Sequence, residues 1–252
     1  MKVVGIIPSR YNSTRFPGKP LAMIKGKTMI QRVCEQAWKS KLDAVVVATD
    51  DMRIAEEVLG FGGQYVLTDP NHPSGTDRCR EALYMVEGHY DAVVNIQGDE
   101  PFIDPEQINQ VIELIGRNDT QLASLAKRIE DEKELFSQNT VKVVMDREGN
   151  ALYFSRNPIP FMRNIDHEKW LQKGVFYKHV GIYGYKVETL RQIAEMQPTA
   201  LENSESLEQL RWLENGLSIR MGITKSENVS IDHPSDIEKA NQFAQNQSCS
   251  AR

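Results

Sequence analysis

Short apolar, β-branched runs alternate with segments of helical periodicity through the first hundred residues of the chain. Alternation of this kind, with strands that are apolar along almost their whole length, is typical of a parallel sheet covered by helices on both faces. The pattern predicts strands at residues 3–9, 44–49, 64–68 and 91–97, with helices at 29–40, 51–61 and 77–87.

The rhythm changes after a further predicted helix at 106–115. Strand-like segments follow at 122–129, 141–145, 151–155, 179–186 and 219–223, with a helix at 206–215 and a last helix that starts at Pro234. Residues 146–150 have the composition of a hairpin turn. We therefore predict an α/β fold with a mostly parallel core at 1–121 and 187–245 and a smaller mixed α+β lobe at 122–186. The two are expected to form one continuous fold unit, followed by a loose polar tail at 246–252.

Composition places the chain among ordinary globular proteins. Of its 252 residues, 40% are hydrophobic and 26% charged, with 30 basic against 35 acidic side chains. This balance excludes disordered and collagen-like chains, and the net charge of −5 argues against general nucleic-acid binding. No apolar run is long enough for a membrane span or a secretory signal, so we expect a cytoplasmic protein. Cys34, Cys79 and Cys249 are widely spaced, which favours reduced thiols over disulfides or a zinc site.

The basic side chains are unevenly distributed. The first 34 residues hold seven of them and no acidic one, and Arg10, Arg15 and Lys19 follow directly after the first predicted strand. Ligands of open α/β sheets bind at the carboxyl ends of the strands. A loop with Gly18, hydroxyl residues and three cations suits a polyphosphate, held by backbone N–H groups and point charges. On charge alone, a solvated basic loop without a ligand is an equal alternative.

Two familiar phosphate-binding motifs are absent from the sequence. Gly26-Lys27-Thr28 resembles the end of a Walker A loop, but Leu21 stands where that motif requires glycine, and the distance from the first strand is wrong. The glycines at 60–63 lack the last glycine of a dinucleotide fingerprint and follow a predicted helix, which favours a helix C-cap.

A second candidate site is the turn Ser74-Gly75-Thr76-Asp77-Arg78, which enters a helix. Thr76 or Asp77 is expected to cap this helix, and Arg78 falls in its first turn, where the dipole disfavours a cation. An arginine in that place is stabilised by a nearby anion. The alternative is an ordinary capped helix with a surface arginine.

Carboxylates supply the third candidate. Asp99 follows the apolar run that ends at Gln97, and Asp232 precedes the last helix on an extended segment. Mg²⁺ bound to a nucleotide commonly takes one or two protein carboxylates together with phosphate oxygens. An aspartate after a strand can also serve as a cap alone, and Asp236 fits a helix start, so both interpretations stay open at this point.

Taken together, these segments resemble the CMP-Kdo synthetase family, the 3-deoxy-manno-octulosonate cytidylyltransferases. The matching stretches are IPSR at 7–10, STRFPGKPL at 13–21, VATD at 47–50, SGTDR at 74–78, NIQGDEP at 95–101, VKVV at 141–144, ALYFSR at 151–156, HVGIYGY at 179–185, SLEQLR at 206–211 and IDHPSD at 231–236. The phosphate loop is shared loosely by many sugar nucleotidyltransferases, whereas the segments around 153–156, 179–183 and 207–211 sharpen the resemblance to enzymes of Kdo. Ser9 departs from the family, which usually has alanine there.

The resemblance implies a Rossmann-like nucleotidyltransferase core and a role for each candidate residue. Nucleotide binding would fall to Pro8, Ser9, Arg10, Arg15, Lys19, Ser74, Gly75, Arg78 and Gln97, with Gln97 where CTP meets the sugar. The ligands of Mg²⁺ would be Asp99 and Asp232. The Kdo pocket would be lined by Arg156, His179, Tyr183, Glu205 and Gln209, with Arg156 facing the sugar carboxylate. On spacing alone, His179 and Tyr183 would be alternating residues of a half-buried strand.

The implied reaction is attack of the anomeric 2-hydroxyl of Kdo on the α-phosphorus of CTP, giving CMP-Kdo and pyrophosphate for lipopolysaccharide synthesis. The candidate catalytic residues are Arg10, Lys19, Asp99 and Asp232, because the basic loop and Mg²⁺ offset the repulsion between two anionic substrates. One Mg²⁺ on the two aspartates would activate the hydroxyl, and a second would ride on the triphosphate.

Other hypotheses predict different behaviour. The nearest alternative is the same chemistry on another acidic sugar, such as sialate or 8-amino-Kdo. A regulatory protein that binds nucleotide without turnover would not need both Asp99 and Asp232, and an assembly protein on this fold would have no affinity for CTP. The resemblance also suggests a homodimer formed through the smaller lobe, with no nucleic-acid or membrane partner.

Overall fold

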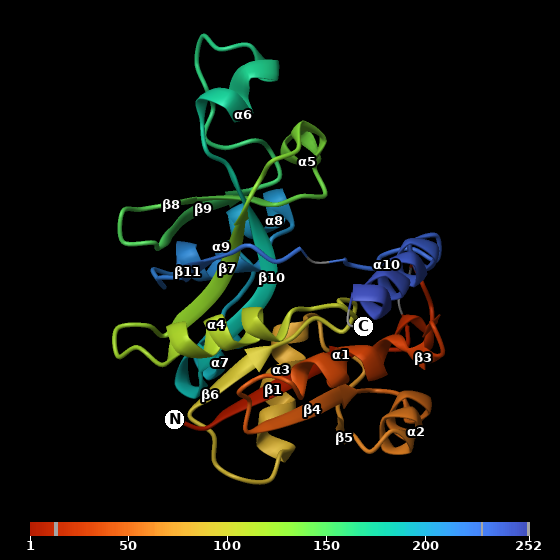
Figure 1. Cartoon of the computed structure of the whole chain (residues 1–252). Coiled ribbons are helices and arrows are strands. Elements are labelled where there is room, and N and C mark those ends of the chain that lie inside the picture. Colours follow the sequence, from red (N-terminus) through yellow and green to blue (C-terminus); the bar gives the residue numbers. More distant parts are fainter. Residues whose placement is uncertain (13–14, 228, 251–252) are drawn as a thin grey trace. The chain divides into compact units, whose positions relative to one another are not determined.

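The chain folds into two units (Figure 1). The first comprises residues 1–109 and 227–252, and the second comprises residues 110–226. The computed structural model describes residues 1–12, 15–227 and 229–250. Among these residues, no helix has both the length and the apolar character needed to cross a membrane.

Four parallel strands pair in the first unit. β1 (Val3–Ser9) lies between β6 (Ala92–Asn95) and β4 (Ala44–Thr49), and β5 (Gln64–Leu67) pairs with the other edge of β4. The side chains of β1, β4 and β6 are buried almost throughout, as expected of parallel strands covered on both faces. All four strands confirm the apolar runs, although β6 ends two residues early, before the turn at Gln97-Gly98.

The helices of the first unit begin at polar caps. α1 (Met29–Ala37) and α2 (Met52–Gly60) follow Thr28 and Asp51, whose side chains accept hydrogen bonds from the first turn. α2 ends in a left-handed glycine, Gly62, so the C-cap interpretation of residues 60–63 is confirmed.

The cap of α3 (Gly75–Met85) differs from the prediction. Ser74 is the N-cap, and its Oγ accepts from the backbone N–H of Asp77 at 3.1 Å, so the expectation of Thr76 or Asp77 was wrong. The helix starts two residues earlier than its apolar periodicity indicated, because the first turn is polar and carries no hydrophobic signal.

A short 3-10 turn, η1 (Lys19–Leu21), precedes the hairpin of β2 (Met23–Ile24) and β3 (Lys27–Thr28), and α10 (Asp236–Ser250) packs against this hairpin. Its Ala240 and Ala244 enter an apolar cluster with Ile24, Met29 and Ile231. The helix continues to Ser250, where a loose tail was expected, while residues 251–252 lie outside the described residues.

The second unit is mixed. β7 (Leu122–Arg128) pairs antiparallel with β10 (Tyr177–Lys186) and parallel with β11 (Arg220–Thr224), and β8 (Lys142–Met145) joins β10 to β9 (Ala151–Ser155). The hairpin turn between β8 and β9 is confirmed by the bond from Asp146 N–H to the Asn150 carbonyl at 2.9 Å.

The second unit extends beyond the expected lobe of 122–186 on both sides. All of β11 pairs with β7, α7 (Val187–Ile193) packs on β10, and α9 (Glu208–Glu214) packs on β9. These contacts hold residues 187–226 in the second unit, and the boundary at residue 109 falls inside α4 (Pro105–Ile115). Sequence periodicity missed α5 (Glu132–Phe136), α6 (Trp170–Lys173), α7 and α8 (Ala200–Glu205), which have two turns or fewer.

Candidate active site

A pocket of about 250 Å³ opens in the first unit beyond the carboxyl ends of β1 and β6. Its lining residues are Pro8, Ser9, Arg10, Arg15, Lys19, Pro20, His72, Pro73, Ser74, Gly75, Arg78, Gln97, Gly98 and Asp99. The fold thus brings together every residue predicted for the nucleotide, from three segments far apart in the chain, together with one of the two predicted metal ligands. Their roles as ligands remain predictions.

The floor of the pocket is closely packed backbone. A Cβ on Gly98 would lie 2.9 Å from the Pro8 carbonyl oxygen and 2.9 Å from Ser9 Oγ, so only glycine fits between the end of β6 and the end of β1. The Ser9 side chain is buried, and its Oγ has no hydrogen-bond partner among the described residues. A buried hydroxyl without a partner is costly unless a ligand or water satisfies it.

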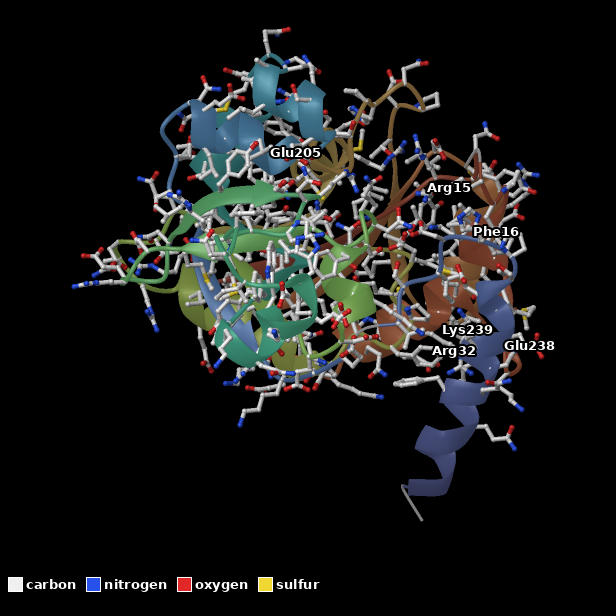
Figure 2. The ribbon with its side chains drawn as sticks, turned by 90° about the horizontal axis from the view of Figure 1, so that it is seen from above. Arg15, Phe16, Arg32, Glu205, Glu238 and Lys239 are labelled. Carbon is white, nitrogen blue, oxygen red and sulfur yellow. The ribbon has the colours of Figure 1, made fainter. Side chains whose placement is uncertain are left out.

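The loop after β1 is closed by its own backbone. Gly18 has φ +70°, and its N–H donates to the Tyr11 carbonyl at 2.9 Å, which turns the chain so that Lys19 faces the pocket. Phe16 anchors this loop in the apolar cluster under α10, whose first turns carry Glu238 and Lys239 in Figure 2. The hydroxyl residues expected in this loop, Ser13 and Thr14, lie outside the described residues.

Lys19 joins the two predicted metal ligands. Its Nζ lies 2.8 Å from Asp99 Oδ2, 4.0 Å from Asp232 Oδ1 and 2.9 Å from the Ile231 carbonyl, to which it donates. Arg15 reaches the same oxygen of Asp232 at 3.0 Å. Two carboxylates that are far apart in the sequence therefore meet around one ammonium group.

Asp236 explains how Asp232 is oriented. The Asp236 carboxylate accepts from the backbone N–H groups of Asp232 and His233 at 3.0 and 2.8 Å. Partial burial acts to raise the pKa of Asp236, but these hydrogen bonds outweigh it and the pKa is lowered. Asp236 is thus a structural cap at the start of α10, and Asp232 is left facing the cations of the pocket.

The donor set at this point fits Mg²⁺. Asp99 and Asp232 are hard oxygen donors that already converge on a shared cation, Lys19. Within residues 1–12, 15–227 and 229–250, no three His, Cys, Asp or Glu side chains are grouped to hold a metal ion by themselves. Two carboxylates completed by phosphate oxygens and water are the usual protein contribution to a nucleotide-bound Mg²⁺.

Arg78 is not the surface side chain that was one alternative for it. Its side chain is 4% exposed, and its guanidinium donates to Asp50 Oδ2 at 3.2 Å and to Thr68 Oγ1 at 2.5 Å. Asp50 also accepts from the Tyr11 backbone N–H at 3.3 Å. This buried ion pair ties the first turn of α3 to the ends of β4 and β5 and to the basic loop.

Sequence reasoning missed His72 in the pocket wall. Its Nε2 lies 2.5 Å from Glu81 Oε2, and Glu81 also accepts from the Asp69 backbone N–H at 2.8 Å. The one signal in the sequence was its place in the turn just before the α3 cap, which alone does not separate a ligand from a loop residue.

Arg156 and Glu205 form one group in the second unit; Figure 2 labels Glu205. The Glu205 carboxylate accepts from Ser155 Oγ at 2.6 Å and from the Arg156 backbone N–H at 2.9 Å. The Arg156 guanidinium donates to the carbonyls of Glu205, Gln138 and Ser206. Glu205 therefore holds the end of β9 in place, and three of the five N–H groups of Arg156 are engaged with backbone.

His179 and Tyr183 form a second group on β10. Their ring centroids are 5.2 Å apart, and Tyr183 meets Trp212 edge-to-face at 5.0 Å. Trp212 and the buried Gln209 both belong to α9, so three predicted sugar residues share this aromatic neighbourhood. Burial lowers the pKa of His179 to about 3, and burial together with the charge of Glu208 raises that of Tyr183.

Comparison with known proteins gives the same family at every level. A family model described as "Cytidylyltransferase" matches residues 4–219. A 3-deoxy-manno-octulosonate cytidylyltransferase of Parabacteroides distasonis is 53% identical over 98% of this chain and 99% of its own length. One of Thermodesulfovibrio yellowstonii is 49% identical over 95% and 97%. The solved structure of a CMP:2-keto-3-deoxy-manno-octonic acid synthetase complexed with CTP is 38% identical, with TM-score 0.91, and covers 98% of this chain and 100% of that one.

More distant solved structures share the fold. A 4-diphosphocytidyl-2C-methyl-D-erythritol synthase from Anaerococcus prevotii superposes with TM-score 0.62 at 14% identity, over 97% of this chain and 96% of that one. The predicted Rossmann-like nucleotidyltransferase fold is confirmed by the match to the CMP:2-keto-3-deoxy-manno-octonic acid synthetase structure.

Proposed function

This chain belongs to the cytidylyltransferase family and, within it, to the 3-deoxy-manno-octulosonate cytidylyltransferases, and from this premise we propose that it transfers a cytidylyl group from CTP to Kdo. The 2-hydroxyl oxygen of Kdo forms a bond to the α-phosphorus of CTP, and the bond from that phosphorus to the oxygen bridging to the β-phosphate breaks. Pyrophosphate and the hydroxyl proton are released. The product, CMP-Kdo, carries the sugar in activated form for lipopolysaccharide synthesis.

The observation that carries the proposal is the composition of the pocket beyond β1 and β6. Arg10, Arg15 and Lys19 line it, and so does the start of α3 at Ser74 and Gly75, where backbone N–H groups are left without helical acceptors. A triphosphate brings nearly four negative charges, and fixed cations and N–H groups offset them without reorganisation during the reaction.

The same pocket supports a place for Mg²⁺ on Asp99 and Asp232. Bound there with the triphosphate, the ion would supply Lewis-acid polarisation of phosphate oxygens and lower the pKa of the attacking hydroxyl. Lys19 and Arg15 now neutralise these carboxylates, and both cations are within reach of a ligand in the pocket. Phosphate oxygens offer them equivalent partners, so nucleotide binding can free the carboxylates without leaving a cation unpaired.

The second unit offers the polar groups for an acidic sugar. Arg156 retains two N–H donors beyond its three backbone contacts, enough for a bidentate carboxylate. His179, Tyr183, Glu205 and Gln209 complete the set proposed to bind Kdo.

We also propose a homodimer formed through the second unit, in the cytoplasm. Large apolar side chains that are exposed on this unit support the dimer: Leu152 is 61% exposed, Phe161 71% and Val175 48%. The free thiols of Cys34 and Cys79 are compatible with a reducing compartment. Sedimentation analysis of the full chain tests the dimer, and a monomer at micromolar concentration would contradict it.

Pyrophosphate release tests the activity. The full chain is assayed with Kdo and Mg²⁺ in parallel with CTP, UTP, ATP and GTP, and with sialate and 8-amino-Kdo in place of Kdo. We expect rapid release with CTP and Kdo, abolished by a chelator. Release only with another sugar would overturn the assignment of Kdo. No release from any triphosphate would overturn the enzymatic proposal, and calorimetry with CTP would then separate a nucleotide sensor from a protein without affinity for CTP.

A further inference from the structure

Ser124, on β7, contacts the His179 ring from inside the second unit. Its side chain is fully buried, and its Oγ lies 2.9 Å from His179 Nε2. The same Oγ lies 2.8 Å from the Ile182 carbonyl oxygen and 3.3 Å from that of Val180. β10 carries an irregularity between Val180 and Tyr183, which places both carbonyls beside this one hydroxyl.

The geometry determines which atom donates. A serine hydroxyl has one proton and two lone pairs, and a carbonyl oxygen only accepts. The proton of Ser124 is therefore directed to a carbonyl, at 2.8 Å to Ile182. Towards His179 the hydroxyl has only a lone pair to offer, so the 2.9 Å contact requires a proton on Nε2.

The surroundings of the ring keep it neutral. Phe154 meets it edge-on with centroids 5.1 Å apart, and Tyr183 lies at 5.2 Å. In this apolar setting burial lowers the pKa of His179 to about 3, so the ring carries a single proton near neutral pH. With that proton on Nε2, Nδ1 is left with a lone pair that can accept a hydrogen bond.

We propose that Ser124 is a positioning residue that holds His179 as the Nε2–H tautomer, so that Nδ1 accepts a hydrogen bond from a hydroxyl group of the sugar substrate. The inference rests on the proposed function for the identity of the substrate. It also fixes the orientation of the sugar. A hydrogen-bond acceptor at Nδ1 binds a hydroxyl group and repels a carboxylate, so the sugar carboxylate belongs at Arg156. The structure thereby gives different chemical duties to two residues that the sequence placed in one pocket.

The tautomer is tested without any substrate. Long-range ¹⁵N–¹H correlation spectra of the ¹⁵N-labelled full chain near neutral pH distinguish protonated from unprotonated ring nitrogens. The chain has five histidines, and the His179 signals are those lost in His179→Gln. We expect Nε2 protonated and Nδ1 unprotonated, with the second tautomer becoming populated in Ser124→Ala. A predominant Nδ1–H tautomer, or an imidazolium ring, in the unsubstituted protein would overturn the proposal.

Kinetics test the consequence for the sugar. Ser124→Ala is expected to raise the KM for Kdo by about tenfold, the scale of one hydrogen bond, with the KM for CTP unchanged. Ser124→Thr, which restores the hydroxyl, should recover most of that loss. Ser40→Ala is the matched control, because Ser40 Oγ donates to the Ala37 carbonyl at the end of α1, in the other unit.

The outcomes separate this proposal from the proposed function. Turnover of Kdo by the unsubstituted chain, with an unchanged KM in Ser124→Ala, would overturn the role of Ser124 alone. Absence of turnover with Kdo would overturn the proposed function, while the spectra would still decide the tautomer. Thermal melts of each variant identify one that does not fold, and the spectra of the unsubstituted chain remain decisive in that case.

Discussion

The pocket proposed for the nucleotide in the first unit and the aromatic neighbourhood proposed for the sugar in the second offer a ligand different kinds of interaction. In the first unit, loops after parallel strands supply cations that are paired with carboxylates, as Lys19 is with Asp99. In the second, the paired strands β7 and β10 bring together neutral groups, such as the hydroxyl of Ser124 and the ring of His179. Permanent charges suit a polyphosphate, whereas a sugar with several hydroxyls and one carboxylate needs donors and acceptors of defined direction.

The two regions also differ in what a ligand can displace. The ion pairs of Arg15 and Lys19 with Asp232 and Asp99 join side chains that an incoming phosphate and metal can exchange. Arg156, in contrast, is bound to three backbone carbonyls and cannot be released without disturbing the chain. Charge substitutions in the first region should therefore act on turnover, and substitutions in the second on sugar affinity.

The largest effect is expected for Asp99→Asn. Loss of the carboxylate charge removes a ligand of the proposed Mg²⁺, and turnover should fall by at least about a hundredfold, the scale of one preorganised electrostatic group. Far-UV circular dichroism should be unchanged. Asp166→Asn, which alters a 75%-exposed side chain paired with Lys169, is the control with normal turnover. Substantial activity in Asp99→Asn would contradict the metal assignment.

Asp50→Asn should weaken the fold itself. It leaves the Arg78 guanidinium buried beside a neutral amide, and removal of one partner from a buried pair costs about 3 kcal/mol or more of unfolding free energy. Urea denaturation measures the loss. The exposed Asp166–Lys169 pair provides the contrast, because such pairs contribute less than about 1 kcal/mol. Equal losses in Asp50→Asn and Asp166→Asn would show that the Asp50–Arg78 pair is not buried.

Lowering the pH should reduce the stability of the fold through protonation of His179. The folded-state pKa of about 3 lies below the ordinary value of 6.5, so the folded state binds fewer protons than the unfolded state between these limits. The contribution of His179 to stability is complete above pH 6.5 and is lost as the pH falls towards 3, with a slope of at most about 1.4 kcal/mol per pH unit.

Urea denaturation of the unsubstituted chain and of His179→Gln is measured from pH 7 down to pH 5. The carboxylates are common to both proteins, so the difference between their unfolding free energies reports the contribution of His179 alone. The stability difference between the two proteins should shrink as the pH falls. A constant difference would mean that the His179 pKa is not lowered.

The smallest effect is expected for Glu205→Gln. The amide can still accept from Ser155 Oγ, but its NH₂ group cannot accept from the Arg156 backbone N–H, so the end of β9 loses one charge-assisted bond. The KM for Kdo should rise by about fivefold with the KM for CTP unchanged. Glu188→Gln, at a side chain 81% exposed, is the control. A rise in the KM for CTP instead of the KM for Kdo would place Glu205 in the nucleotide site.

Much of the fold was predictable because its signals are local. The apolar runs of β1, β4 and β6 and the periodicity of α1, α2 and α4 follow from residue order alone. The four short helices of the second unit were not predictable, because two turns or fewer show no clear period and owe their stability to the surfaces on which they pack. His72 was missed for a related reason, since only its place in the pocket wall distinguishes it from any loop histidine.

The amino-acid sequence by itself determined a parallel core, a cluster of cations after the first strand, a carboxylate after β6 and the family to which these segments belong. Tertiary structure alone decided that Lys19 lies between Asp99 and Asp232, that Arg78 forms a buried ion pair with Asp50, and that the His179 ring is neutral. The physical reason is the separation in the sequence over which each interaction acts. Strand and helix propensities act between near neighbours in the chain, whereas ion pairing, burial and pKa depend on groups that only folding brings into contact.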